Sequence, residues 1–161
     1  LELGVDAISF SEDLGSQKGA ICGPRMARKW ILPYQKQLHD LARNAGCLTV
    51  YHCDGAIMDI ADQILEIHPD VFNPQDIANG VENLREAFKD RLCIDLDFDR
   101  QGALPLGTPK EIRDLVEYET RTLGSPTGGM MLHAGVWGDV PPQNVEALVG
   151  AFEEFSLFWF Q

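Results

Sequence analysis

The chemistry of this sequence is concentrated where an apolar run ends abruptly in polar side chains. Residues 47–51 read Cys-Leu-Thr-Val-Tyr and are followed by His52, Cys53, Asp54 and Gly55. The pattern predicts a buried strand that presents an imidazole, a thiol and a carboxylate at its C-terminal end, before a glycine turn. Parallel α/β folds build their sites at this end, because the loops there vary while the strands hold position.

The orientation of these side chains follows from strand geometry. Neighbouring residues of a regular strand point to opposite faces, so His52 and Asp54 share one face and Cys53 points to the other. A nitrogen and a carboxylate oxygen on one face are able to hold a divalent metal, zinc or another ion. The alternative interpretation is that His52 and Asp54 only hydrogen-bond to each other and to nearby loops.

Further polar residues follow other predicted strands. Glu12 and Asp13 come after the first strand, and His133 closes the fifth. We expect Glu12 or Asp13 to complete the ligand sphere of a metal or to transfer a proton, and His133 to act at the same site. The remaining acidic residues at strand ends are Asp95, Asp97 and Asp99. The alternative is that several carboxylates only cap helices or face solvent, and that His133 is a structural residue.

The elements that must position these residues alternate regularly along the chain. Short β-rich runs predict five strands, at residues 5–10, 47–53, 71–73, 92–96 and 128–134. A helical pattern follows each strand, and a capping box from Thr108 to Glu111 begins the helix that Gly124 ends. The predicted inward face of the last helix is formed by Val145, Leu148, Val149 and Phe152.

The first helix is expected to be long. It begins at Gly23-Pro24, is kinked at Pro33 and ends at Gly46. Its apolar positions, which keep helical spacing, are Met26, Trp30, Tyr34, Leu38, Leu41 and Ala45. This spacing places His39 on the polar side of the helix, at the surface.

The alternation of strands and helices predicts one α/β domain over residues 1–161, with a parallel sheet covered by helices. An open doubly wound sheet and a (β/α)₈ barrel both fit this pattern. A closed barrel has eight units in ~250 residues, so five units would form only part of one. The nucleotide-binding fingerprints GxGxxG and GxxxxGK[ST] are absent from the sequence.

Composition excludes some classes of function. The 161 residues include 25 acidic and 13 basic side chains, which gives a net charge of −12. Such a chain is expected to repel nucleic acid. No apolar run is long enough to span a bilayer and no basic-then-apolar leader occurs, so we expect a cytoplasmic protein without a membrane partner. The cysteines form no CxxC pair and are expected to be reduced.

Six separate stretches carry a resemblance to a known family. They read Glu-Asp-Leu-Gly at 12–15, Leu-Pro-Tyr at 32–34, His-Cys-Asp-Gly at 52–55, Asn-Pro at 73–74, Leu-Pro-Leu-Gly-Thr-Pro at 104–109, and Gly-Gly at 128–129 leading to Val-Pro-Pro-Gln-Asn at 140–144. In this order and spacing they resemble the uroporphyrinogen decarboxylase superfamily, which includes the corrinoid-linked methyltransferases. The resemblance runs from the first predicted strand to Phe155.

The resemblance implies that the chain is the C-terminal half of a (β/α)₈ barrel and a fragment of a longer protein. The first residue is Leu rather than Met, and residues 1–4 are expected to form the last turn of an earlier helix. A half barrel leaves two strand edges unpaired. The expected partner is therefore a missing N-terminal half or a second copy in a homo-oligomer, and the apolar residues 155–161 would suit such an interface.

The resemblance also implies a metal. In the methyltransferase branch this strand end supplies His and Cys to zinc, and a further Cys near the last strand completes the set. The metal lowers the pKa of a thiol substrate, whose thiolate attacks a methyl group on a corrinoid protein. Here His52 occupies the His position, Asp54 stands where Cys is expected, and Cys93 is the last cysteine.

By this resemblance we expect His52 and Asp54 to bind zinc or another divalent metal, with a small-molecule substrate and a corrinoid protein as partners, in methyl transfer or O-demethylation. One alternative is porphyrinogen decarboxylation, a metal-free reaction of porphyrin biosynthesis. That activity needs residues of the other half, and this acidic chain suits a polyanionic substrate poorly. The other alternative is a non-catalytic half barrel that binds a partner subunit.

Overall fold

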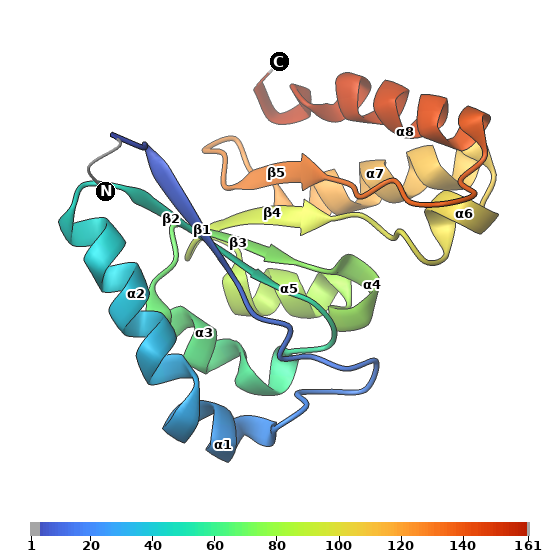
Figure 1. Cartoon of the computed structure of the whole chain (residues 1–161). Helices are drawn as coiled ribbons and strands as arrows, with labels where there is room; N and C mark the ends of the chain where they lie inside the picture. The colour runs from blue at the N-terminus through green and yellow to red at the C-terminus, as the bar shows by residue number, and fades with distance from the viewer. Residues whose placement is uncertain (1–3, 161) are drawn as a thin grey trace.

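The computed structural model describes residues 4–160, and the helical turn expected at residues 1–4 falls largely outside that range. Five strands form one parallel sheet in the order in which they occur along the chain. The strands are β1 (Ala7–Ser11), β2 (Leu48–Cys53), β3 (Val71–Pro74), β4 (Cys93–Asp97) and β5 (Met130–His133). Figure 1 shows each strand lying beside the next. The predicted parallel α/β fold is therefore confirmed.

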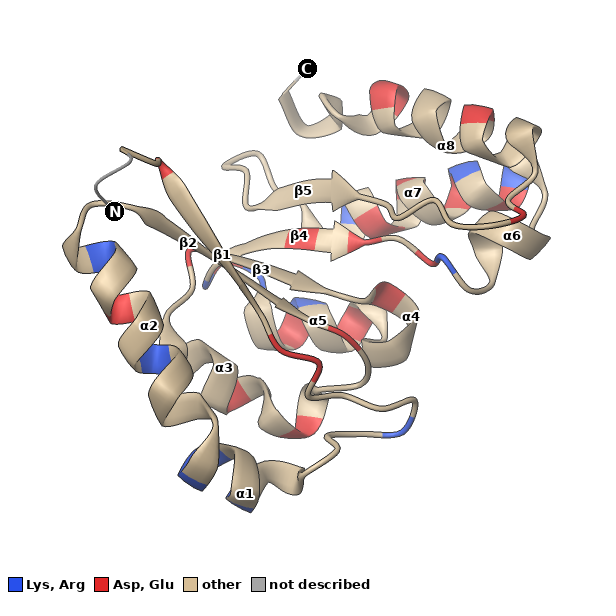
Figure 2. Cartoon of the chain, in the orientation of Figure 1, with Lys and Arg blue, Asp and Glu red and all other residues tan. Residues whose placement is uncertain are grey.

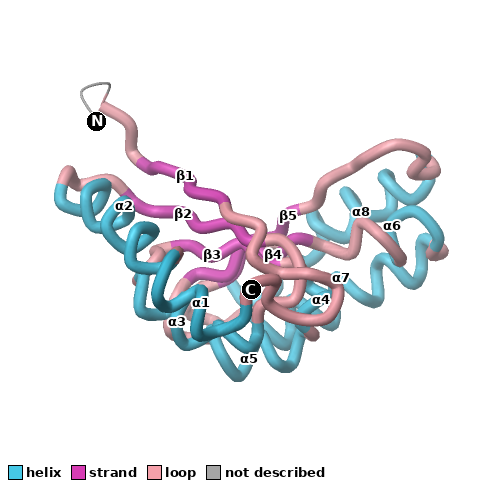
Figure 3. The backbone as a smooth tube through the Cα atoms, turned by 60° about the horizontal axis from the view of Figure 1, so that its bottom comes forward, coloured by secondary structure: helices cyan, strands magenta, loops and turns pink. Residues whose placement is uncertain are grey.

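The helices lie on one side of this sheet. They are α1 (Gly23–Trp30), α2 (Leu32–Asn44), α3 (Ala61–Ile67), α4 (Asp76–Asn79), α5 (Val81–Phe88), α6 (Ala103–Leu106), α7 (Pro109–Leu123) and α8 (Pro142–Phe155), with short 3₁₀ turns η1 (Met58–Ile60) and η2 (Phe158–Phe160). Figure 3 shows a curved sheet with helices along its outer side and none of the described ones on its inner side. A doubly wound sheet would carry helices on both faces, whereas a barrel carries them only outside. We call the helix-free side the open face.

The pleat of the strands decides which residues enter the core. Phe10, Tyr51 and Phe72 point toward the helices, and an aromatic row runs across the sheet through them. His39 of α2 lies between Phe10 and Tyr51, with ring centroids 4.4 and 5.6 Å away. Phe88 of α5 continues the row beyond Phe72 at 5.0 Å. Fully burying an aromatic or large aliphatic side chain stabilises a fold by roughly 1.5–3 kcal/mol, so this row anchors β1, β2 and β3 to their helices.

The long first helix was wrongly predicted as one element. The chain breaks at Ile31 into α1 and α2, and Pro33 lies in the first turn of α2. Within a continuous helix, Pro33 would lack the N–H that bonds to the carbonyl of Lys29, and its ring would clash there. In a first turn the same fixed φ is favourable, so the helix restarts before Pro33 rather than bending at it.

The face of this helix pair was also wrongly assigned. The predicted apolar row is exposed, with Trp30 and Leu41 54% and 61% exposed, respectively. The core-facing residues are instead Ala27, Leu32, Gln35, His39 and Ala42. His39, expected at the surface, is fully buried. Periodicity marks an apolar face but not the element that covers it, and within residues 4–160 nothing covers this one.

Smaller differences occur elsewhere. Val149 was expected to face inward but is exposed, because the positions of α8 that meet its neighbours are Asn144, Leu148, Ala151 and Phe155. The short helices α4 and α6 follow β3 and β4 without any periodic signal. The capping box of α7 is present as predicted: the Thr108 side chain accepts from the backbone N–H of Glu111, and the Glu111 side chain accepts from the backbone N–H of Thr108.

None of the described helices combines the length and apolar character that a membrane span requires.

Candidate functional site

The register of β1 and β2 brings two predicted site residues together on the open face. Ser11 pairs with His52, and the N–H of Glu12 donates to the carbonyl of His52 at 3.1 Å. Asp13, the next residue, therefore lies beside the imidazole. Its Oδ1 is 4.0 Å from His52 Nε2, and Oδ1 of Asp54 is 3.3 Å from the same nitrogen. One ligand atom from each of these three residues lies within 4.8 Å of the others.

Asn73 determines which ring nitrogen of the His52 imidazole carries the proton. The Asn73 side-chain nitrogen donates to the carbonyl of Asp95 at 2.5 Å, so its oxygen faces Nδ1 of His52, 2.6 Å away. An amide oxygen only accepts, which assigns the proton to Nδ1 and leaves Nε2 with a free lone pair. That lone pair faces the carboxylates of Asp13 and Asp54. These three converging acceptor atoms form a candidate ligand set for a metal ion.

The spacing of these atoms suits a small divalent metal. Zinc bonds to nitrogen and oxygen of about 2.0–2.2 Å place neighbouring tetrahedral ligands roughly 3.3 Å apart. The His52–Asp54 separation of 3.3 Å meets this spacing, and the Asp13 oxygen at 4.0 Å is slightly farther. Asp13 is exposed in the loop after β1. A donor set of one imidazole and two carboxylates is typical of zinc and related transition metals rather than of a thiolate-rich site.

Glu12 is directed away from this group. It follows Phe10 by two residues and lies on the helix side of the sheet, where its carboxylate accepts a hydrogen bond from Gln35 of α2 at 2.8 Å. The sequence left Glu12 and Asp13 as equivalent candidates. The structure places only Asp13 beside His52.

Arg100 is a site residue that the sequence did not indicate. It lies in the loop after β4, and one of its terminal nitrogens donates to both carboxylate oxygens of Asp54, at 2.7 and 2.8 Å. The other terminal nitrogen is 3.2 Å from the carboxylate of Asp97. Asp97 is 2% exposed, and burial raises its pKa although the guanidinium opposes that shift. In the sequence, the only signal that pointed to Arg100 is its position directly after the acidic end of the predicted fourth strand.

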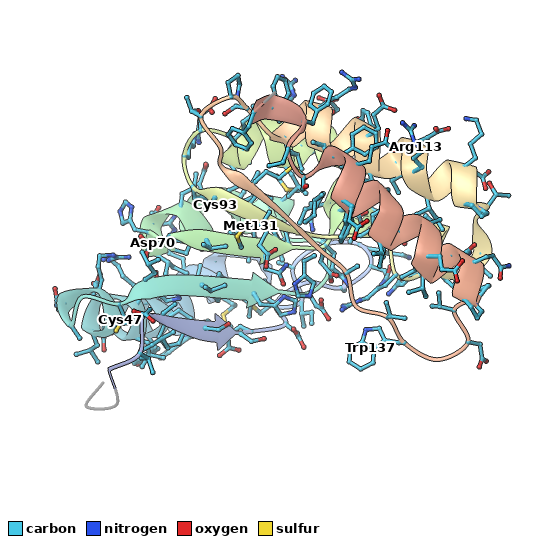
Figure 4. The ribbon with its side chains drawn as sticks, turned by 90° about the horizontal axis from the view of Figure 1, so that it is seen from above. Cys47, Asp70, Cys93, Arg113, Met131 and Trp137 are labelled. Carbon is cyan, nitrogen blue, oxygen red and sulfur yellow. The ribbon has the colours of Figure 1, made fainter. Side chains whose placement is uncertain are left out.

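His133 forms a second pair on the open face. Its Nδ1 is 3.6 Å from the carboxylate of Asp95. Asp95 lies diagonally across from His133, because the register of β4 and β5 pairs His133 with Asp97. Burial raises the pKa of Asp95, and both His133 and His52 act in the opposite direction. His133 is outside the group formed by Asp13, His52 and Asp54. In Figure 4, viewed from above, Met131 of β5 lies over the sheet near its centre and Trp137 lies at the outer edge of the loop that follows.

Cys53 has no access to the site. It is fully buried on the helix side, where its sulfur accepts a hydrogen bond from the N–H of Leu14 at 3.3 Å. Burial raises the pKa of the Cys53 thiol to about 11, so the thiol stays protonated. The alternation predicted for Cys53 and Asp54 is therefore confirmed.

Acidic residues dominate the site. Asp13, Asp54, Asp95 and Asp97 lie at the C-terminal ends of β1, β2 and β4. Arg100 contacts two of them, Asp54 and Asp97. Figure 2 shows the acidic positions at the ends of β1 and β4, while α1 at the other side of the molecule carries basic ones. The field at this end of the sheet therefore favours cations.

The chain is similar to known proteins in both sequence and structure. The sequence matches the family model described as Uroporphyrinogen decarboxylase (URO-D) over residues 1–155. No curated protein sequence gives a significant match. Among solved structures, a methyltransferase from Methanosarcina mazei is similar with a TM-score of 0.69 and 18% sequence identity, covering 96% of this chain and 44% of that one. At this identity the similarity shows the fold, and the chain spans less than half of that structure's length.

Proposed function

Because the chain belongs to the uroporphyrinogen decarboxylase family, as its sequence predicted, we propose that it carries the metal-binding part of a methyltransferase active site. The observation that carries the proposal is the lone pair of His52 Nε2, which faces the carboxylates of Asp13 and Asp54. The methyltransferase fold of the Methanosarcina mazei protein agrees with this choice within the family. A bound divalent metal would lower the pKa of a thiol acceptor, which then accepts a methyl group.

The residues of this chain have separate roles in the proposal. His52 and Asp54 are the principal ligands, and Asp13 supplies a third oxygen from its loop. Asn73 holds the imidazole in the tautomer that ligation requires. The His133–Asp95 pair lies on the same open face and is suited to move a proton to or from the substrate.

The proposal concerns part of a larger site. The described residues form five βα units, and a closed barrel has eight, so three further units would complete the wall around the open face. We propose that they contribute most of the pocket for a small-molecule substrate. A corrinoid protein that carries the methyl group would be the macromolecular partner, docking at the C-terminal ends of the strands.

Bound metal is the direct test. Protein prepared without chelator or affinity tag is examined by elemental analysis, alongside a variant with His52→Ala and Asp54→Ala. We expect near-stoichiometric zinc or another divalent ion in the parent and its loss in the variant. A matched control changes His68 and Asp114 to Ala, because this histidine and carboxylate lie outside the site. A folded parent that neither contains nor takes up metal would overturn the proposal.

A second candidate is porphyrinogen decarboxylation. The observation that favours it is Arg100, a cation at the carboxylate-rich end of the sheet that is able to bind a substrate carboxylate. Turnover of a porphyrinogen by the complete barrel, unchanged after metal removal, would support this activity over methyl transfer.

A further inference from the structure

The Arg100–Asp54 pair uses the same oxygen that the candidate metal group needs. Oδ1 of Asp54 accepts from the guanidinium at 2.7 Å and is also the atom 3.3 Å from His52 Nε2. Oδ2 accepts from the same nitrogen at 2.8 Å. Both oxygens of this carboxylate are therefore occupied by one cationic side chain. A metal ion and a guanidinium that share one carboxylate repel each other at close range.

Asp97 offers the guanidinium a second place. It lies 3.2 Å from the other terminal nitrogen of Arg100. Its Oδ1 has no hydrogen-bond partner among residues 4–160, although the side chain is 2% exposed. A buried carboxylate oxygen without a partner is costly, so a shift of the guanidinium toward Asp97 gains a hydrogen bond there. The structure thus holds one cation between two carboxylates, one of which is only partly satisfied.

The backbone around Arg100 is fixed, so this shift concerns the side chain. Asp99 accepts hydrogen bonds from the N–H groups of Gln101, Gly102 and Ala103 at 3.0, 2.8 and 2.7 Å. These bonds hold the turn that leads into α6 and tie down the chain next to Arg100. Rotation of the Arg100 side chain, not movement of the loop, is then the step that frees Asp54.

We propose that Arg100 is an internal competitor for the metal, which holds Asp54 while the site is empty and moves onto Asp97 when a divalent cation binds. The inference rests on the proposed metal-binding function and adds a residue that regulates metal affinity. Arg100 acts through Asp54 and is a positioning residue. Its guanidinium lowers metal affinity, so the site discriminates against weakly bound cations.

The test is calorimetric titration of the metal-free chain with zinc and, separately, manganese. Arg100→Gln is expected to bind metal at least tenfold more tightly than the parent. Arg28→Gln is the matched control, because Arg28 also donates two hydrogen bonds to one carboxylate, that of Glu66, outside the site and its loss changes net charge equally. Arg28→Gln is expected to change the affinity less than twofold. Equal or weaker binding by Arg100→Gln than by the parent would overturn the inference.

A double-variant cycle separates this role from a structural one. In the Asp54→Asn background the gain from Arg100→Gln should fall below threefold, because the competed carboxylate is gone; a full tenfold gain there would also overturn the inference. If Arg100→Gln fails to fold, it is combined with Asp97→Asn, which removes the buried charge that Arg100→Gln leaves without a partner. The metal affinity of this double variant is then compared with that of Asp97→Asn alone. Absence of metal binding in both the parent and Arg100→Gln would reject the metal proposal itself, which distinguishes the two failures.

Discussion

His52 and Asn73 lie on neighbouring strands with Nδ1 of the imidazole 2.6 Å from the amide oxygen, and this contact decides which ring nitrogen is free. Asn73 is itself held by the carbonyl of Asp95 and is nearly buried. The site therefore depends on three consecutive strands rather than on the motif alone.

The first prediction concerns this contact. Asn73→Ala removes the acceptor that fixes the tautomer of His52, so metal affinity should fall by about 10- to 100-fold, as for other partners that orient a ligating histidine. Competition with a chromophoric chelator measures the change. Asn83→Ala, which removes an asparagine of α5 outside the site, serves as the control. Unchanged affinity in Asn73→Ala would contradict the assigned role.

The second prediction concerns a buried acid pair. Glu119 of α7 and Asp76 of α4 are in contact and almost fully buried. Burial and the neighbouring carboxyl raise the pKa of Glu119 well above its ordinary value, and burial raises the pKa of Asp76 to about 6. The folded state therefore binds more protons than the unfolded state above the ordinary carboxyl pKa. Stability should fall as pH rises from about 4 through 6 and beyond.

Glu119→Gln keeps a hydrogen-bond donor beside Asp76 and removes a titrating group from the pair. At pH 8 we expect this variant to be more stable than the parent by about 1–3 kcal/mol, with little difference at pH 5. Urea unfolding at both pH values measures this difference. Glu86→Gln, an exposed change on α5, should have the same small effect at each pH. A constant difference between the pH values for Glu119→Gln would contradict the linkage.

The third prediction concerns His39. Burial lowers its pKa to about 4, and within the part of the chain that the structure describes neither ring nitrogen has a hydrogen-bond partner. The unfolded state binds the proton near pH 6.5 and the folded state only near 4, so stability present above pH 6.5 is lost as pH falls toward 4. His39→Leu should lessen this acid sensitivity by about 2–3 kcal/mol between pH 7 and 4. Thermal unfolding of both proteins across this range is the measurement, with His68→Leu as the exposed counterpart.

The fourth prediction separates packing from ligation at the motif. Cys53→Ser places a hydroxyl in the apolar core and should destabilise the fold by about 1–3 kcal/mol. Metal stoichiometry should stay the same, since the sulfur lies on the opposite face from His52. Denaturant unfolding and elemental analysis of one preparation measure both effects. Loss of metal from a folded Cys53→Ser protein would place the thiol in the site after all.

Most of the fold was open to prediction because its signals are local. The five apolar runs, the turn at Gly55 and the capping box at Thr108 each act within a few residues, so the order of elements follows from the chain. The break at Ile31 also has a local cause, since Pro33 favours the first turn of a new helix. The burial of His39 was missed for a different reason: it depends on the packing of α2 against β1 and β2, which the spacing of residues along the helix does not contain.

The sequence alone determined the class of fold, the family and the strand end that carries the candidate site. Alternation along β2 also placed His52 and Asp54 on one face and Cys53 on the other, because a pleat of period two is local geometry. Only the tertiary structure decided the remaining partners. Pairing of separate strands chose Asp13 over Glu12 and set Asn73 against His52, and the loop after β4 brought Arg100 to Asp54 across 46 residues. These contacts come from the register between strands and the path of loops, and both are properties of the folded sheet.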